Sequence, residues 1–338
     1  MAALVAILNS IRRAVQRDLR SFEAIKFNNF FLIVAVLAIM QPESAAFLLI
    51  LLGVLVLFPI SSDPLAKIPT SRLQLWPLST NQRFALRLAS LALSPVIWIA
   101  IILILRKVNY VVALLFIGLA VVIQFLIAAA RRRARRAPRW ELFLYIPRLP
   151  GRFGFVVQKD IRDLFTLLDT WLAILFCTGA VCYRFLSRNP NPAAFPTISI
   201  LIAIILSTYM QSLFGLELKL SLVRYRLLPL RGWEVLLAKD VAIFGLLIIL
   251  VLPLSPLTGI TAGLAALAIG HHSSILIHLP QKRWRFASGT IWPVGIVQIA
   301  GCFTLGLGEQ QKGIVVLALT GAAYIFSLWW YGRKWQDV

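Results

Sequence analysis

The side chains best suited to metal chemistry are the three histidines of the chain, His271, His272 and His278, which share the segment HHSSILIH. Imidazole is a common ligand of zinc and of other transition metals. A site of this kind needs further ligands, however, and no Asp or Glu lies near these histidines in the sequence. We therefore interpret the segment as a polar patch at the end of an apolar run, and we predict no metal site.

Motifs for nucleotide and hydrolytic chemistry are absent from the sequence. It contains no G-x-x-x-x-G-K-[ST] motif, whose loop cradles nucleotide phosphates, and no G-x-S-x-G or H-E-x-x-H motif. We therefore expect a chain that is not an enzyme, has no catalytic residues and holds no cofactor of its own.

The composition is that of a membrane protein. Of the 338 residues, 60% are hydrophobic and 14% are charged, and the mean hydropathy is +0.85. About 20 apolar residues are needed for a helix to cross the bilayer, and helices satisfy their own backbone hydrogen bonds there. The sequence predicts an all-α, polytopic membrane protein with about ten transmembrane helices. The expected spans are residues 27–41, 45–60, 84–105, 108–130, 164–183, 195–216, 235–253, 257–279, 290–307 and 313–331.

The net charge of +21 is distributed unevenly over the loops between these spans. If both termini are cytoplasmic, only Arg106, Lys107, Arg184, Arg188 and Lys312 of the 34 Lys and Arg residues lie on the other side. This asymmetry follows the positive-inside rule. It favours an integral, multi-pass protein of the cell membrane, expected to be a bacterial inner membrane. The basic loops then face anionic lipid headgroups, and we expect no nucleic-acid partner.

The middles of the predicted spans contain no Asp, Glu, Lys or Arg. Asp169 comes nearest, and we interpret it as interfacial. Transporters that couple to protons or sodium commonly place an ionisable group in the membrane. The chain is therefore expected to take its energy from outside itself. The remaining polar residues of the spans suit contacts between helices; these residues are Gln124, Ser207, Thr208, Gln211 and Gln298.

Two motifs occur twice in the same order. RLQLWPLSTNQRFALR at 72–87 aligns without gaps with RYRLLPLRGWEVLLAK at 224–239, at an offset of 152 residues. QRDLR at 16–20 returns as QKDIR at 158–162, at an offset of 142 residues. The pair of matches predicts a tandem duplication.

Each half would begin with a basic amphipathic helix that lies in the membrane interface. Its charged residues are Arg17, Asp18 and Arg20 in the first half and Lys159, Asp160 and Arg162 in the second. The basic residue that ends each proline motif, Arg87 or Lys239, is expected to snorkel to the cytoplasmic face. The predicted organisation is an interfacial helix at 1–26, a first membrane repeat at 27–130 with a cytoplasmic loop at 61–87, a basic linker with the second interfacial helix at 131–163, a second repeat at 164–279 with a loop at 217–239, and an additional helix pair at 290–331.

The proline loops carry apolar residues on a turn whose backbone proline restricts. A membrane domain driven from outside needs such a short rigid element for docking to its partner, and exposed apolar anchors suit that role. The alternative is that these residues merely begin helices. The residues expected to bind a partner are Leu75, Trp76, Pro77, Leu78 and Ser79 in the first loop, and Leu227, Leu228, Pro229, Leu230, Arg231 and Trp233 in the second.

This pattern of a basic elbow helix, two crossings and a loop of the R-x-x-L-x-P-L type resembles the permease subunits of ABC-2-type ABC transporters. The resemblance implies that the proline loops are coupling helices for a separate ATP-binding subunit, in one or two copies, where ATP and magnesium would bind. It further implies an exporter. The usual permease has six spans and one such loop, so this chain would be a fused pair or a divergent member that forms a homodimer.

Two other functions remain open from the sequence. One is a secondary transporter or channel built from parallel repeats. The other is a membrane assembly protein that transports nothing. The sequence does not identify a substrate.

Overall fold

The computed structural model describes residues 110–134, 151–217, 225, 230–277 and 279–337, together with single positions and short stretches before residue 110. The described residues form helices, and no strand occurs among them. The chain divides into an N-terminal unit, Met1–Arg136, and a C-terminal unit, Ala137–Val338, which are described separately. The all-α prediction is therefore confirmed for the described residues.

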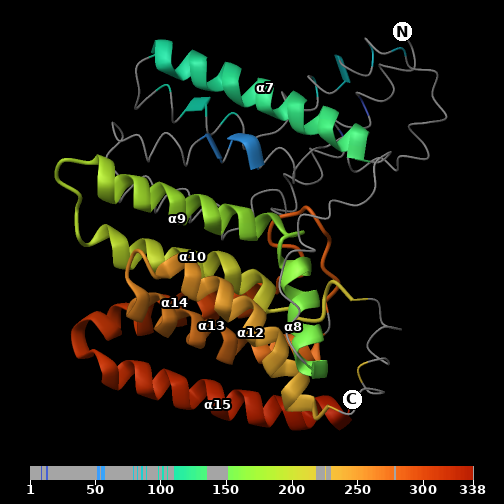
Figure 1. The fold of residues 1–338 in the computed structure, drawn as a ribbon, viewed down its shortest axis with the longest axis vertical. Coiled ribbons are helices and arrows are strands. Elements are labelled where there is room, and N and C mark those ends of the chain that lie inside the picture. The colour runs from blue at the N-terminus through green and yellow to red at the C-terminus, as the bar shows by residue number, and fades with distance from the viewer. Residues whose placement is uncertain are drawn as a thin grey trace. The chain divides into compact units, whose positions relative to one another are not determined.

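The N-terminal unit contains the long helix α7, Tyr110–Ala134 (Figure 1). It covers the predicted span from residue 110 to residue 130 and runs on through the first three arginines of the basic linker. The Gln124 side chain donates a hydrogen bond to the backbone carbonyl of Val56, as expected for a polar contact between segments far apart in the sequence. Leu114, Leu115 and Leu126 are exposed, so α7 presents apolar side chains outward.

Seven helices make up the described part of the C-terminal unit (Figure 1). They are α8 (Gly151–Leu164), α9 (Leu168–Leu186), α10 (Ala194–Met210), α12 (Gly232–Val251), α13 (Pro256–Leu276), α14 (Trp292–Lys312) and α15 (Ile314–Asp337). Short connections at 187–193, 252–255 and 313 join successive long helices, so α9 and α10, α12 and α13, and α14 and α15 form antiparallel pairs. We call the end of the bundle that holds these three connections the connection end, and the other the α8 end.

α13 lies at the centre of the bundle and packs against α10, α12, α14 and α15. Its small residues allow this, because they let neighbouring backbones come close. A β-carbon added at Gly263 would lie 2.1 Å from Cδ2 of Leu247 on α12, and one added at Gly270 would lie 2.4 Å from the carbonyl oxygen of Met210 on α10. The core of the unit is therefore set by close contact between helices.

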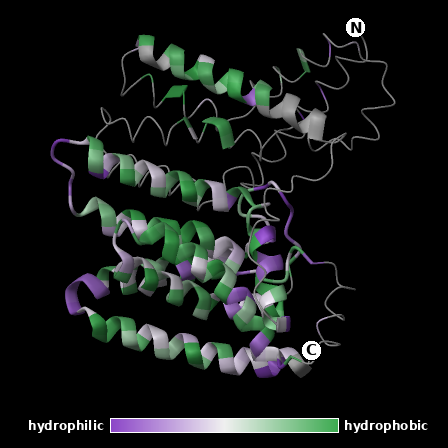
Figure 2. Ribbon diagram, in the orientation of Figure 1, coloured by the Kyte–Doolittle hydropathy of each residue, from purple (hydrophilic) through white to green (hydrophobic). Residues whose placement is uncertain are grey.

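Within the described part of the chain, three helices are long and apolar enough to cross a membrane: α9, α13 and the Ile314–Trp335 part of α15. α10 and the segment Leu114–Leu126 are shorter apolar helices. Only 17% of an 18-residue apolar stretch of α15 is buried, and Figure 2 shows the apolar residues of α15 along the length of the helix. An outward apolar face of this kind suits lipid contact. The spans predicted before residue 108 lie for the most part outside the described residues.

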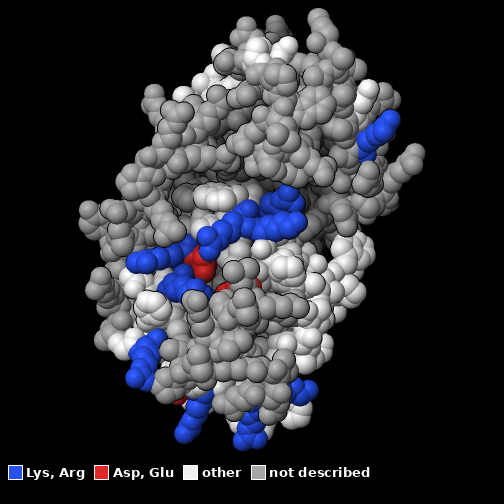
Figure 3. All heavy atoms as spheres, turned by 90° about the vertical axis from the view of Figure 1, so that its right-hand side faces the viewer, with Lys and Arg blue, Asp and Glu red and all other residues white. Residues whose placement is uncertain are grey.

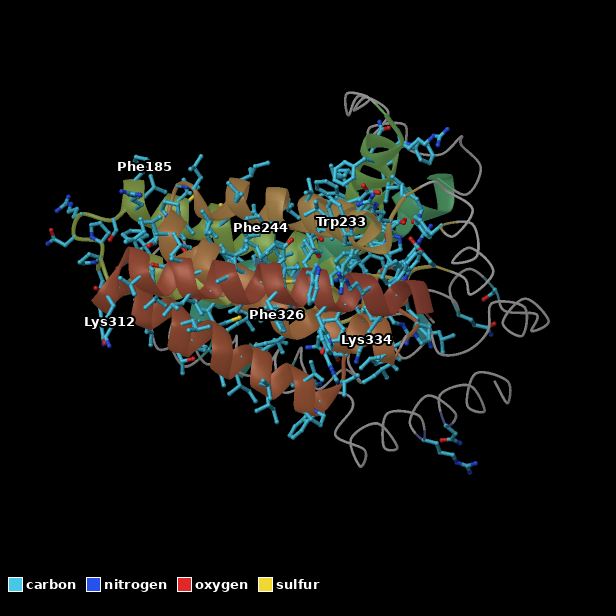
Figure 4. All side chains as sticks on the ribbon, turned by 90° about the horizontal axis from the view of Figure 1, so that it is seen from below. Phe185, Trp233, Phe244, Lys312, Phe326 and Lys334 are labelled. Atoms are coloured by element: carbon cyan, nitrogen blue, oxygen red, sulfur yellow. The ribbon has the colours of Figure 1, made fainter. Side chains whose placement is uncertain are left out.

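The two ends of the C-terminal unit differ in charge. Arg184, Arg188 and Lys312 lie at the connection end, which Figure 4 shows through Phe185 and Lys312. The α8 end is much richer in Lys and Arg, and it faces the viewer in Figure 3. Its cationic residues include Arg152, Lys159, Arg162, Arg231, Lys282, Arg283, Arg285, Arg333 and Lys334. Within this unit, the division matches the one that the positive-inside rule predicts from the sequence.

The place of α8 at the membrane interface stays a prediction, but two apolar residues of the side expected to face the membrane lie inside the protein. Val157 and Leu164 are buried in the protein, and α8 packs against α12. Phe155, on another side of α8, is exposed. The difference arises because α12 offers α8 an apolar surface and, as shown below, a buried charge.

The close approach at Gly270 gives a test of the packing. Gly270→Ala places a methyl group against the backbone carbonyl of Met210, which cannot move aside as a flexible side chain can. We expect a loss of about 1–3 kcal/mol in stability and a lower melting temperature of the purified protein.

Gly245→Ala in α12 is the matched control, because a β-carbon at Gly245 meets nothing within 4 Å. This variant should melt at or above the wild-type temperature, since Ala favours a helix over Gly by roughly 0.5–1 kcal/mol. Equal melting of the two variants would contradict the close contact.

Candidate functional site

A buried lysine on α12 forms the centre of the site. Lys239 is 0% exposed and lies two turns into α12, and its Nζ is 3.1 Å from Oδ1 of Asp160 on α8. The same Nζ is 2.9 Å from Oε1 of Glu217, which follows α10. The prediction that Lys239 snorkels to the membrane surface is therefore wrong, because two carboxylates hold its ammonium group inside the protein.

Aromatic rings and a second lysine complete the surroundings of Lys239. Its Nζ is 4.8 Å from the ring centroid of Phe214 and 5.6 Å from that of Tyr225, distances at which a ring face attracts a cation. Lys159 Nζ lies 2.6 Å from the same Oε1 of Glu217, and the Tyr225 hydroxyl donates to that oxygen at 2.5 Å. The two lysines thus face Asp160 and Glu217, and Lys159 lies also 3.9 Å from Oδ2 of Asp163.

Glu217 is the group that both lysines share. Burial disfavours its charged form, but the nearby Lys239 and Lys159 outweigh burial and lower the pKa of the Glu217 carboxyl. A carboxylate is the form that can accept hydrogen bonds from both ammonium groups and from Tyr225. Glu217 therefore joins the segment after α10 to α8 and to α12 at once. We call Lys239, Asp160, Glu217, Lys159 and Tyr225 the ionic cluster.

The structure separates the predicted residues of the second interfacial helix. Asp160 is fully buried in the ionic cluster, Lys159 lies at its edge with 39% of its side chain exposed, and Arg162 is exposed. Arg17, Asp18 and Arg20 of the first helix lie outside the described residues. A repeated acidic residue in an otherwise basic motif was the signal for an inward contact, and the sequence analysis did not use it.

The second proline loop leads directly into α12. Leu230 is half-buried, Arg231 is exposed and Trp233 is 38% exposed, whereas Leu227, Leu228 and Pro229 lie outside the described residues. The backbone N–H of Arg231 donates to Oε2 of Glu234 at 2.7 Å, which caps the first turn of α12.

The first proline loop carries the same contact at the aligned position. The backbone N–H of Ser79 donates to Oε1 of Gln82 at 3.0 Å, and the N–H of Gln82 donates to Oγ of Ser79 at 3.3 Å. This is a capping box. Ser79 and Gln82 correspond to Arg231 and Glu234 at the offset of 152 residues. Leu75, Trp76, Pro77 and Leu78 lie outside the described residues. The docking hypothesis expects a helix to begin at these positions. The alternative, that the loop residues merely begin a helix, expects the same, so the capping box is compatible with both.

A second polar cluster lies on another side of α12. Asp240 follows Lys239 in the sequence, and its Oδ2 is 3.0 Å from Nε2 of His271 on α13 and accepts a hydrogen bond from Tyr324 on α15 at 2.9 Å. Nδ1 of His271 is 3.0 Å from Oγ of Ser327, also on α15. We call these four residues the histidine cluster. The sequence analysis missed it because Asp240 is 31 residues from His271.

Further polar residues in the bundle are also buried. Asp169, expected at the depth of the membrane interface, is buried within the protein in the first turn of α9, and its carboxylate accepts hydrogen bonds from the backbone N–H of Ala287 at 3.0 and 3.2 Å. Glu309 accepts a hydrogen bond from Thr258 at 2.7 Å. The bundle thus contains buried ionisable groups whose partners the sequence analysis did not predict.

The predicted interhelical polar residues behave differently from one another. Gln211 donates to Gln298 on α14 at 2.6 Å and so connects two segments of the bundle. Ser207 and Thr208 instead donate to carbonyls of their own helix, at Ile204 and Ile205. Only the glutamines act as contacts between helices here.

The two histidines that the structure describes have different partners. His271 is buried, His272 is exposed with its Nδ1 2.9 Å from the hydroxyl of Tyr331, and His278 lies outside the described residues. Among the residues that the structure describes, no three His, Cys, Asp or Glu side chains are placed to hold a metal ion.

Comparison of the chain with protein-family models, with curated proteins and with solved structures found no match. Its function is therefore argued from the repeated motifs and the two clusters.

Removing the ammonium group of Lys239 should lower the stability of the protein more than removing an exposed ammonium group. Lys239→Met leaves Asp160 and Glu217 buried without that cation, and breaking a buried ion pair on one side costs about 3–5 kcal/mol. We expect a large fall in the melting temperature of the purified protein. Lys239→Met with Asp160→Asn should regain part of the loss, because one of the two buried charges is then gone.

Lys312→Met is the matched control, since Lys312 is exposed at the connection end. A surface change of this kind is expected within about 0.5 kcal/mol of wild type. If Lys239→Met and Lys312→Met melt alike, the ionic cluster does not hold the bundle together.

Proposed function

We propose that the chain is the membrane-spanning permease subunit of an ABC transporter of the ABC-2 type, internally duplicated and acting as an exporter. Its two proline loops would dock to one or two copies of a separate ATP-binding subunit, which would supply ATP hydrolysis and hold magnesium. Both termini would face the cytoplasm, in a cell membrane with anionic lipid headgroups.

The observation that carries this proposal is the contact between Lys239 and Asp160. Asp160 belongs to the repeated motif QKDIR, and Lys239 ends the repeated proline motif. The contact gives the two motifs one physical role: the elbow helix and the helix after the proline loop are held together by a buried ion pair. A duplication explains why acidic Asp18 and basic Arg87 stand at the matching positions of the first half.

The ionic cluster also provides a route for force. A partner that pushes on Leu230, Arg231 and Trp233 acts on the first turn of α12, and Lys239 lies two turns further on. Because Lys239 contacts both α8 and the segment after α10, α12 cannot shift alone. A movement imposed at the loop would therefore reach the elbow helix and the middle of the bundle, as an ATP-driven transporter requires.

The exposed arginine of the second loop allows a test of docking that leaves the core unchanged. Arg231→Glu reverses a surface charge, while the backbone N–H that caps α12 remains. We expect capture of a co-expressed ATP-binding subunit by the tagged chain in mild detergent to fall roughly tenfold, equivalent to about 1.4 kcal/mol. Leu78→Asp and Leu230→Asp should each remove about half of the captured subunit, and together all of it.

Arg188→Glu is the matched control, because Arg188 is an exposed arginine at the connection end. Each variant must also melt within a few degrees of wild type, so that a folding defect is not taken for lost docking. If the wild-type chain captures no ATP-binding subunit, or if capture survives all three loop changes, the proposal is wrong.

The proposed repeat makes a prediction about the first half, where Asp18 and Arg87 lie outside the described residues. Arg87→Met should lower the melting temperature, and adding Asp18→Asn should restore part of it, as for Lys239 and Asp160. The control is Arg83→Met, because Arg83 aligns with the apolar Val235. If adding Asp18→Asn raises the melting temperature of Arg83→Met as much as that of Arg87→Met, the two halves do not share this pairing.

A secondary transporter is the second candidate, and one observation favours it. The pair Asp240–His271 is an ionisable group buried between three helices of the bundle, and such groups commonly bind coupling ions in transporters. Substrate transport by the purified chain alone, in liposomes with a proton gradient and without an ATP-binding subunit, would support this candidate over the first. The assembly-protein alternative has no observation in its favour.

A further inference from the structure

The histidine cluster joins three helices by hydrogen bonds whose protons can be counted. Four heavy-atom contacts are involved: Tyr324 hydroxyl to Asp240 Oδ2 at 2.9 Å, Asp240 Oδ2 to His271 Nε2 at 3.0 Å, His271 Nδ1 to Ser327 Oγ at 3.0 Å, and Ser327 Oγ to the carbonyl oxygen of Ala268 at 2.8 Å. Each contact needs one proton between its two atoms.

Neutral histidine and ionised aspartate supply one proton too few. Tyr324 uses its own proton on Asp240. The other three contacts need three protons, but a neutral His271 brings one and the Ser327 hydroxyl brings one. One of these contacts is then left without a proton. When a third proton is present, all four contacts are satisfied at once, with Nδ1–H donating to Ser327 and Ser327 donating to Ala268.

The charges around the cluster also favour the additional proton. His271 and Asp240 are 0% and 1% exposed in their side chains. With a neutral imidazole, Asp240 would be a buried negative charge. The adjacent Lys239 does not compensate it, because Lys239 is paired with Asp160 and Glu217. From α15 the groups that contact the cluster by hydrogen bonds are the neutral hydroxyls of Tyr324 and Ser327. An added proton makes the pair neutral overall, which lowers the cost of burying it.

We propose that Asp240, His271, Tyr324 and Ser327 form a binding site for one proton, and that the bound proton fastens α15 to α12 and α13. The proton lies between Asp240 and His271, so the pair exists either as imidazolium with carboxylate or as imidazole with carboxylic acid. In both forms Nδ1 of His271 carries a proton. In the proton-free form, the imidazole places its single proton on Nε2, toward Asp240. The proposal does not depend on the partner subunit.

The three histidines of the chain make a direct measurement feasible. His272→Asn with His278→Asn leaves His271 as the only imidazole, and nitrogen-15 NMR of the histidine-labelled full chain in lipid reports which ring nitrogens carry protons. At pH 7.5 we expect a proton on Nδ1 of His271, either as the imidazolium or as the Nδ1–H imidazole. A neutral imidazole protonated on Nε2 alone would overturn the proposal.

Two further variants test whether the His271 signal depends on the histidine cluster. Asp240→Asn removes the carboxylate that pairs with the added proton, and Asn brings N–H donors of its own, so His271 should then be a neutral imidazole at pH 7.5 with no imidazolium signal. Thr320→Ala is the matched control, because Thr320 is a buried hydroxyl on α15 that donates to Val316 of its own helix. It should leave the His271 signal unchanged. If His271 is an imidazolium in Asp240→Asn, or if Thr320→Ala changes the His271 signal, the site is not the one proposed.

Discussion

The ammonium group of Lys239 is the constraint on which the C-terminal unit depends. A lysine that is fully removed from solvent must be paired, since an unpaired buried charge costs several kcal/mol. Its two carboxylate partners come from α8 and from the segment after α10. The requirement to pair one charge thus brings together elements that are 79 and 22 residues apart in the sequence. Apolar packing alone would not specify that arrangement.

In a membrane the hydrophobic effect does not draw helices together, because lipid tails are as apolar as the side chains. Close packing and polar contacts must do so instead. The unit uses both: small residues of α13 accept Leu247 and the Met210 carbonyl, and Gln211, Asp169 and Glu309 connect segments through hydrogen bonds. The outer faces, above all that of α15, remain apolar. Two of the buried charged residues, Lys239 and Asp240, are neighbours on α12, and their partners fix its position from two sides.

The sequence predicted the helical fold and the approximate positions of α9, α10, α13 and α15, because length and hydropathy are local properties. It did not predict the clusters, which depend on pairs of residues far apart. Lys239 near the start of an apolar run is consistent with snorkelling as well as with burial, and only the place of Asp160 decides between them. The repeated motifs did contain a clue, since an acidic residue and a basic residue recur together in both halves.

The two clusters are not independent, because Lys239 and Asp240 are neighbours on one helix. Successive residues of an α-helix point about 100° apart, so Lys239 faces α8 while Asp240 faces α13 and α15. A rotation of α12 must alter the contacts of both residues, and a shift along its axis strains both as well. A partner acting at the second proline loop would therefore act on the histidine cluster too. Conversely, loss of the proton from that cluster would loosen α12 on one side, and the force needed to move it would fall.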